Sequence, residues 1–183
     1  MSKKNFLITT ILLLAVGLLG RLIPHPWNMT PITAIALFGS ARFGFKYSLM
    51  LVFAVMLITD AFIGFYDWQI MLSVYASFGM VALIGLCIKK RERAPSVILG
   101  AVSSSLLFFL VTNWAVWQFG TMYSPGLVGL AQSYVMALPF FQNMLIGDVI
   151  YSGAIFGAFA FLEKGNPFLK QLPSSSSPSS IRN

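Results

Sequence analysis

The sequence has little charge of either sign and few of the residues that carry most enzyme chemistry. Only 9% of its 183 residues are Asp, Glu, Lys or Arg, and it contains one histidine and one cysteine. Soluble domains have about 25% charged residues, so this chain cannot present an ordinary charged surface to water. One cysteine excludes an internal disulfide, and no CxxC pair or His/Cys cluster is present to bind structural zinc.

Catalytic motifs are lacking as well. The sequence has no GxSxG, HExxH or Walker A motif. His25 lies between two prolines with no matching nucleophile, and Cys87, which precedes the run KKRER by one residue, is interpreted as a buried, inert thiol. We therefore expect no catalytic residue, no metal and no cofactor, and an intramembrane enzyme is the least favoured class. Without a phosphate-binding loop, the chain cannot itself use ATP.

The composition is dominated by apolar residues. They make up 57% of the chain, and the mean hydropathy is +0.81. Because a helix needs about 20 apolar residues to cross a bilayer, the sequence predicts an all-α six-helix transmembrane bundle. A single transmembrane domain, 1–165, would precede a disordered tail, 166–183, that is rich in Ser and Pro. The expected spans are 6–23, 31–45, 46–66, 68–88, 96–119 and 141–162.

Two of these spans leave alternatives open. The first follows a basic start as a signal peptide does, but no small-residue cleavage site comes after it, which favours an uncleaved span. The second has only fifteen residues, which as a helix extend about 22 Å. Before the last span, Pro139 interrupts the apolar run, which suggests a separate re-entrant or amphipathic stretch at 124–140.

The basic residues predict the orientation. If both termini are cytoplasmic, 11 of the 12 Lys and Arg residues lie inside and only Arg21 lies outside, as the positive-inside rule requires. We therefore expect a multi-pass protein of the bacterial cytoplasmic membrane. The net charge of +7 is divided among short groups with no continuous basic face, which argues against a nucleic acid partner.

The polar and aromatic residues gather on the expected outer side, where all four tryptophans fall. An aromatic belt is the alternative explanation, but a belt is expected at both interfaces. Trp114, Trp117 and Gln118 are spaced to share one helix face. Intramembrane carboxylates mark functional sites, although Asp60 and Asp148 could also hydrate or cap helices near the interface. The candidate substrate-binding residues are Trp27, Asn28, Asp60, Trp68, Asn113, Trp114, Trp117, Gln118, Tyr134, Asn143, Asp148 and Tyr151.

Two segments carry a resemblance to known families. RLIPHPWNMTPITAIALFGSARFG near the start, and TNWAVW and ALPFFQNMLIGDVIY near the end, resemble a family of small, uncharacterised bacterial membrane proteins assigned to transport. That family is similar in turn to the substrate-binding S components of energy-coupling factor transporters, through the stretch LFGSARFGFKYSLMLVFAVMLITD.

The resemblance implies six helices, both termini inside, a lid at 21–31 and a transmembrane coupling subunit with ATPases as partner. The small-residue face that S components use for docking on their first helix is missing from this sequence.

Two functions remain open. The leading hypothesis is uptake of a small molecule, vitamin-like or cationic and aromatic, captured from the outer side of the lipid bilayer. The alternative is a non-transport scaffold in cell-envelope assembly. Small residues recur at four-residue spacing, as at Gly153 and Gly157, and such faces pack helices within a bundle or against a partner.

Overall fold

The computed structural model describes residues 3–89 and 92–165, and within these ranges helices joined by loops are the only regular secondary structure. The six helices are α1 (Lys3–Leu22), α2 (Ile32–Phe43), α3 (Phe45–Ile63), α4 (Trp68–Ile88), α5 (Ala94–Phe119) and α6 (Leu127–Gly165). The tail at 166–183, which the sequence predicts to be disordered, lies outside the described residues.

Five helices have the length and composition of membrane spans. They are α1, α3, α4, α5 and α6, each at least 19 residues long with a mean hydropathy of 1.8 or more in its most apolar part. In these helices at most 39% of that part is buried within the chain. Apolar side chains that face outward in such numbers require a lipid environment. The protein is therefore a multi-pass membrane protein.

Helix α2 is different, because it is short and almost wholly enclosed. Its 12 residues extend about 18 Å, too little to cross about 30 Å of hydrocarbon. All residues from Ile32 to Ala41 are buried, against α3, α4, α5 and α6. The close approach to α4 depends on Gly85, where an added Cβ would lie 2.7 Å from the Leu37 carbonyl oxygen. Gly44, with φ of 98°, ends α2 and starts α3.

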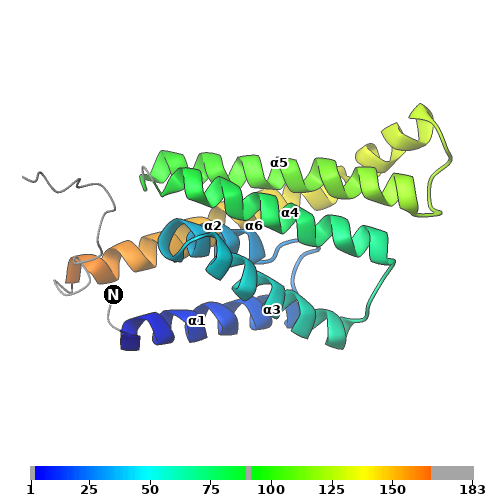
Figure 1. Cartoon of the computed structure of the whole chain (residues 1–183). Helices are drawn as coiled ribbons and strands as arrows, with labels where there is room; N and C mark the ends of the chain where they lie inside the picture. The colour runs from blue at the N-terminus through cyan, green and yellow to red at the C-terminus, as the bar shows by residue number, and fades with distance from the viewer. Residues whose placement is uncertain (1–2, 90–91, 166–183) are drawn as a thin grey trace, which may run out of the picture.

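The helices run alternately along the bundle, as Figure 1 shows. One end, the Arg42 end, contains the start of α1, the α2–α3 junction and the last turns of α6. The opposite end, the Asp60 end, contains the loops 23–31, 64–67 and 120–126. The described parts of the chain thus begin and finish at the same end of the bundle.

Helix α6 differs from the expected arrangement. It has 39 residues and continues through Pro139, whereas the expected span begins at 141 after a separate stretch. At 1.5 Å per residue it extends about 58 Å, nearly twice the hydrocarbon thickness, so its first turns project beyond the other helices at the Asp60 end (Figure 1). One missing N–H at Pro139 does not end a helix that packs along α5, its most extensive neighbour.

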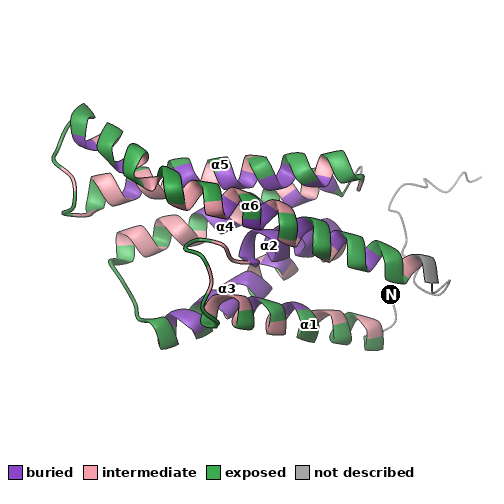
Figure 2. Cartoon of the chain, turned by 180° about the vertical axis from the view of Figure 1, so that it is seen from behind, coloured by how far each residue is buried: buried purple, intermediate pink, exposed green. Residues whose placement is uncertain are grey.

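Two surface features bear on the sequence analysis: one corrects the expectation for Cys87, and the other decides between two alternatives left open for Gly153 and Gly157. Figure 2 shows burial concentrated on α2, while the outer faces of α1, α5 and α6 are exposed. Cys87 lies on an exposed face of α4 and is not buried. Gly153 and Gly157 are exposed on α6, and an added Cβ at either would meet nothing within 4 Å. This small-residue face therefore does not pack within the bundle.

Candidate functional site

A cavity of about 320 Å³ lies among the helices toward the Asp60 end. Every helix contributes to its wall, together with loops 23–31 and 64–67. Its apolar part includes five phenylalanines, and its polar part consists of a few hydroxyls, two amides, one guanidinium and one carboxylate. The lining residues are Arg21, Asn28, Thr30, Ile32, Thr33, Met56, Tyr66, Ile70, Val74, Phe78, Phe108, Phe109, Thr112, Asn113, Val116, Ala137, Phe140, Phe141, Met144 and Asp148.

Helix α5 supplies one wall through a single stripe. Phe109, Thr112, Asn113 and Val116 line the cavity, and their spacing of three, one and three residues places them on one face of a helix. The Asn113 amide donates to the Phe109 carbonyl oxygen at 2.8 Å, so one of its two N–H groups is used within the helix. Its carbonyl oxygen and second N–H are available to the cavity side.

Asp148 provides the carboxylate of the cavity. It is 1% exposed, and the Ser105 hydroxyl lies 2.7 Å from its Oδ2 atom. Ser105 is also 3.0 Å from the Ala101 carbonyl oxygen, but a hydroxyl has one proton and therefore donates to one acceptor at a time. Thr33 adds a second side-chain hydrogen bond to Asp148. Both partners are neutral.

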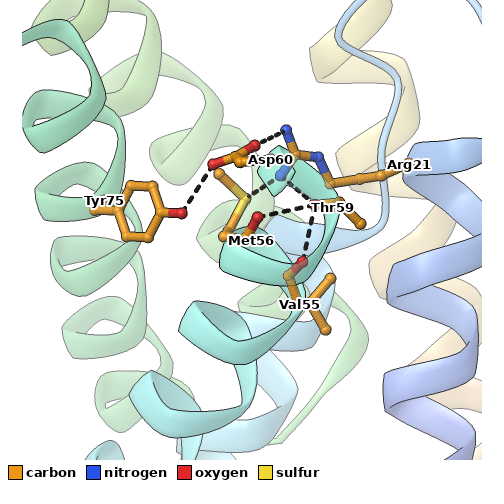
Figure 3. A network of polar contacts seen from close by, with 6 residues as sticks. All are labelled: Arg21, Val55, Met56, Thr59, Asp60 and Tyr75. Carbon is orange, nitrogen blue, oxygen red and sulfur yellow. Dashed lines mark hydrogen bonds and ion pairs between the residues drawn. The ribbon is translucent and has the colours of Figure 1, made fainter. Parts of the chain in front are cut away.

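The second buried carboxylate, Asp60, has a cationic partner. Arg21 Nη2 lies 2.9 Å from Asp60 Oδ1, and the Tyr75 hydroxyl donates to Asp60 Oδ2 at 2.8 Å. The other terminal nitrogen of Arg21, Nη1, donates to the Thr59 hydroxyl at 2.7 Å and contacts the Met56 sulfur. Figure 3 shows how this network joins α1, α3 and α4.

Tyr66, in loop 64–67, lies close enough to this network for the charges of Asp60 and Arg21 to affect its pKa. Its pKa is raised to about 12, because partial burial and the negative charge of Asp60 outweigh the positive charge of Arg21. Tyr66 also lines the cavity. Its hydroxyl is therefore protonated at neutral pH and can donate a hydrogen bond there.

The loop from 23 to 31 covers part of the cavity. Asn28 and Thr30 line the cavity from this loop, and Asn28 adopts a left-handed conformation with φ of 63°, which Asn tolerates better than most residues. The Trp27 ring stacks on Phe140, with centroids 5.2 Å apart. Met29 packs tightly on α6, where an added Cβ on Gly147 would lie 2.7 Å from Met29 Cγ.

The structure brings together only part of the residue set predicted from the sequence. Asn28, Asn113 and Asp148 line the cavity, and Asp60 holds Arg21, which also lines it. Tyr134 donates to the Leu110 carbonyl oxygen at 2.8 Å and is not a lining residue. The other predicted residues that lie outside the wall are Trp27, Trp68, Trp114, Trp117, Gln118, Asn143 and Tyr151.

All four tryptophans belong to the described residues, and none of them lines the cavity. Trp27, Trp68 and Trp114 are 71%, 66% and 44% exposed, and Trp117 donates to the Ser124 carbonyl oxygen at 3.2 Å. Trp114 and Gln118 do share a helix face, but that face is exposed and adjacent to the Asn113 stripe. Their positions match interfacial anchoring, the alternative that the sequence left open.

Several residues of the site were missed by the sequence analysis. Ser105 and Thr33 bind Asp148, and Thr30, Thr112 and Arg21 line the cavity. A signal was present for Ser105, because three consecutive serines, 103–105, interrupt an otherwise apolar span. Arg21 also had a signal as the one basic residue assigned to the outer side.

The Arg42 end has a separate polar cluster, whose residues do not line the cavity described above. Arg42 forms ion pairs with Glu92 and Glu163 and lies 4.7 Å from the centre of the Phe159 ring. The pKa of Glu92 is raised, mainly because the residue is partly buried. Arg42 lowers this pKa, and with smaller effects Glu163 raises it and Lys89 lowers it. The cluster connects α2, the α4–α5 loop and the end of α6. These ion pairs hold the three segments together, which indicates a structural role.

Comparison with known proteins gives one match. The model of a protein family described as a family of unknown function (DUF6580) matches residues 1–171. No curated protein and no solved structure matches the chain.

Proposed function

The chain belongs to this family of unknown function, and we propose that it is a transport protein, the substrate-binding component for uptake of a small molecule. The observation that supports this proposal is the cavity of about 320 Å³ in a multi-pass membrane protein. Ligand sites of about 300 Å³ or more are typically apolar with a few placed polar groups. The cavity has this composition.

The distribution of charge favours entry from the side opposite the cytoplasm. Apart from Arg21, the described basic residues all belong to segments at the Arg42 end. Under the positive-inside rule this end is cytoplasmic, and we propose that both chain termini lie on that side of the membrane. The cavity then lies in the outer half of the bilayer, and loop 23–31 separates it from the outside as a lid.

Coupling to another subunit is part of the proposal, because the resemblance to S components implies one. The exposed Gly153 and Gly157 on α6 leave space where a partner helix can approach closely. The same face supports the second candidate function, a scaffold in envelope assembly that binds partner helices and carries no substrate. The two functions differ in whether the cavity has to be occupied.

The test is a substitution that fills the cavity with a larger side chain, followed by a measurement of whether the purified protein still retains a bound small molecule. Val116→Phe places a ring in the cavity from α5, while Val102→Phe makes the same change on the same helix at an exposed position outside the cavity. Each protein is purified from native membranes in mild detergent, and mass spectrometry identifies small molecules that stay bound.

Transport predicts one molecule retained by the unchanged protein and by Val102→Phe but lost from Val116→Phe, with uptake of that molecule by cells lost in parallel. A stable complex with a partner protein, unaffected by Val116→Phe and free of any retained molecule, contradicts transport and supports the scaffold.

A further inference from the structure

The cavity contains two groups of opposite charge, and their surroundings differ. Arg21 and Asp148 both line it. No other Lys, Arg, Asp, Glu or His is found among the described residues of the wall. The balance between these two groups therefore decides which charge on a ligand the cavity favours.

Arg21 already has a carboxylate counter-ion within the fold. Its Nη2 atom is paired with Asp60 at 2.9 Å, and its Nη1 atom donates to Thr59 at 2.7 Å. Asp60 is 1% exposed, and breaking this pair would leave a buried carboxylate without its counter-ion, which is strongly unfavourable. A ligand carboxylate or phosphate would therefore meet a guanidinium whose positive charge Asp60 already balances.

Asp148 has no such partner. Its described contacts are the hydroxyls of Ser105 and Thr33, which donate hydrogen bonds but carry no formal charge. Thr33 lies in the first turn of α2, where the helix dipole contributes a partial positive charge of about half an elementary charge. Neither hydroxyl carries a formal charge, so no described side chain supplies a counter-ion to the Asp148 carboxylate, and that place is left for a cationic group of a ligand.

The rest of the wall identifies the kind of cation that fits. A hard metal ion such as Ca²⁺ requires six or more oxygen ligands, and the described residues contain no group of three or more His, Cys, Asp or Glu that could hold a metal. Five phenylalanines line the cavity, and aromatic side chains favour organic ammonium groups and aromatic ligand bodies.

We propose that the cavity binds an amphiphilic organic amine, with the protonated nitrogen against the Asp148 carboxylate and an aromatic body among the phenylalanines. This inference rests on the proposed function and specifies its substrate class. The amine hydrogens complete the acceptor positions of Asp148 that Ser105 and Thr33 leave free.

The test compares probes that differ only in charge. The 2-phenylethylammonium ion and 2-phenylethanol have the same aromatic body, as do tryptamine and tryptophol, and phenylacetate supplies the negative charge. Binding to the purified full-length protein in nanodiscs is measured by ligand-observed nuclear magnetic resonance, which detects weak complexes. Hydrogen bonds to charged groups predict that each ammonium probe binds about tenfold or more tightly than its alcohol, and phenylacetate binds least.

Variants locate the preference at Asp148. Asp148→Asn removes the charge with little change in shape, and the preference for the ammonium probe should fall to within about twofold. Asp148→Glu keeps the charge and should keep the sign of the preference. Asp67→Asn is the matched control, because Asp67 is an exposed carboxylate at the same end of the bundle that does not line the cavity.

Two outcomes overturn the inference, and they differ in what they say about the proposed function. If the alcohols bind as tightly as the amines and Val116→Phe abolishes both, the cavity binds small molecules but Asp148 does not select charge. If no probe binds in a way that Val116→Phe removes, the inference about the amine is wrong, and the retention of a native molecule by the unchanged protein then decides the binding function separately. Since the charge comparison is made on the unchanged protein, it is valid even if Asp148→Asn fails to fold.

Discussion

Two carboxylates at the same end of the bundle, Asp60 and Asp148, are each 1% exposed but have different partners. Asp60 has a guanidinium and a phenol, supplied by α1 and α4. Asp148 has two aliphatic hydroxyls, supplied by α5 and α2. The difference separates two uses of buried charge: Asp60 has its counter-ion within the fold and fastens helices together, whereas Asp148 can receive a counter-ion from a ligand.

Replacing each carboxylate by its amide tests this distinction. Asp60→Asn leaves the Arg21 guanidinium, only 16% exposed, without its counter-ion, and we expect a loss of about 3 kcal/mol in the free energy of unfolding. Asp148→Asn leaves no charge behind, and we expect a change within about 1 kcal/mol. Equilibrium unfolding in mixed detergent micelles measures both.

A double variant provides the control for the Asp60 network. Arg21→Met together with Asp60→Asn removes both charges and should recover at least half of the loss seen in Asp60→Asn alone. The comparison fails if Asp148→Asn destabilises the protein as much as Asp60→Asn, because Asp148 would then also have a cationic partner within the fold.

The uncharged hydroxyls that donate to the two carboxylates give a second comparison, with a smaller expected difference in stability. Ser105→Ala removes the nearest donor from Asp148, and Tyr75→Phe removes a donor from Asp60, which retains Arg21. We expect Ser105→Ala to cost about 2 kcal/mol and Tyr75→Phe about 1 kcal/mol, because a buried charge that loses a hydrogen bond is penalised more when no counter-ion remains. The same unfolding measurement applies, and the reverse order would contradict the assignment of roles.

The sequence predicted the membrane-spanning character of the fold well, since apolar runs depend on local composition. It was less informative about α2, whose 12 residues are enclosed by the helices around it. It also placed the start of the last helix at 141, because Pro139 is a strong local signal. Packing of α6 along α5 overrides that signal, and local patterns contain no information on such contacts.

For the candidate site, the sequence pointed to the end of the bundle where the cavity lies, and of its four residues on α5 only Asn113 lines the cavity. Helical spacing showed that Trp114, Trp117 and Gln118 belong together, yet it cannot tell whether a face turns toward lipid or toward the cavity. Phe109 and Thr112, one stripe away, line the wall. Asp148 was singled out from the sequence as a carboxylate within an apolar run, but its partner Ser105 lies 43 residues away in the chain, on another helix.

Tyr66 offers the finest test, since its titration reports the charge of Asp60. Its pKa of about 12 lies above the ordinary phenol value, so the neutral form is favoured in the folded protein. The stabilisation from this shift is complete below about pH 10 and is lost as the pH rises through the raised pKa.

Asp60→Asn removes the negative charge and leaves Arg21, so the Tyr66 pKa should fall toward its ordinary value, whereas Asp148→Asn should leave it unchanged. The ultraviolet absorbance of tyrosinate, as the difference between each protein and its Tyr66→Phe counterpart, measures the change. An equal response to both substitutions would mean that Asp148 acts on this loop as strongly as Asp60, and the two carboxylates would then form a single electrostatic unit.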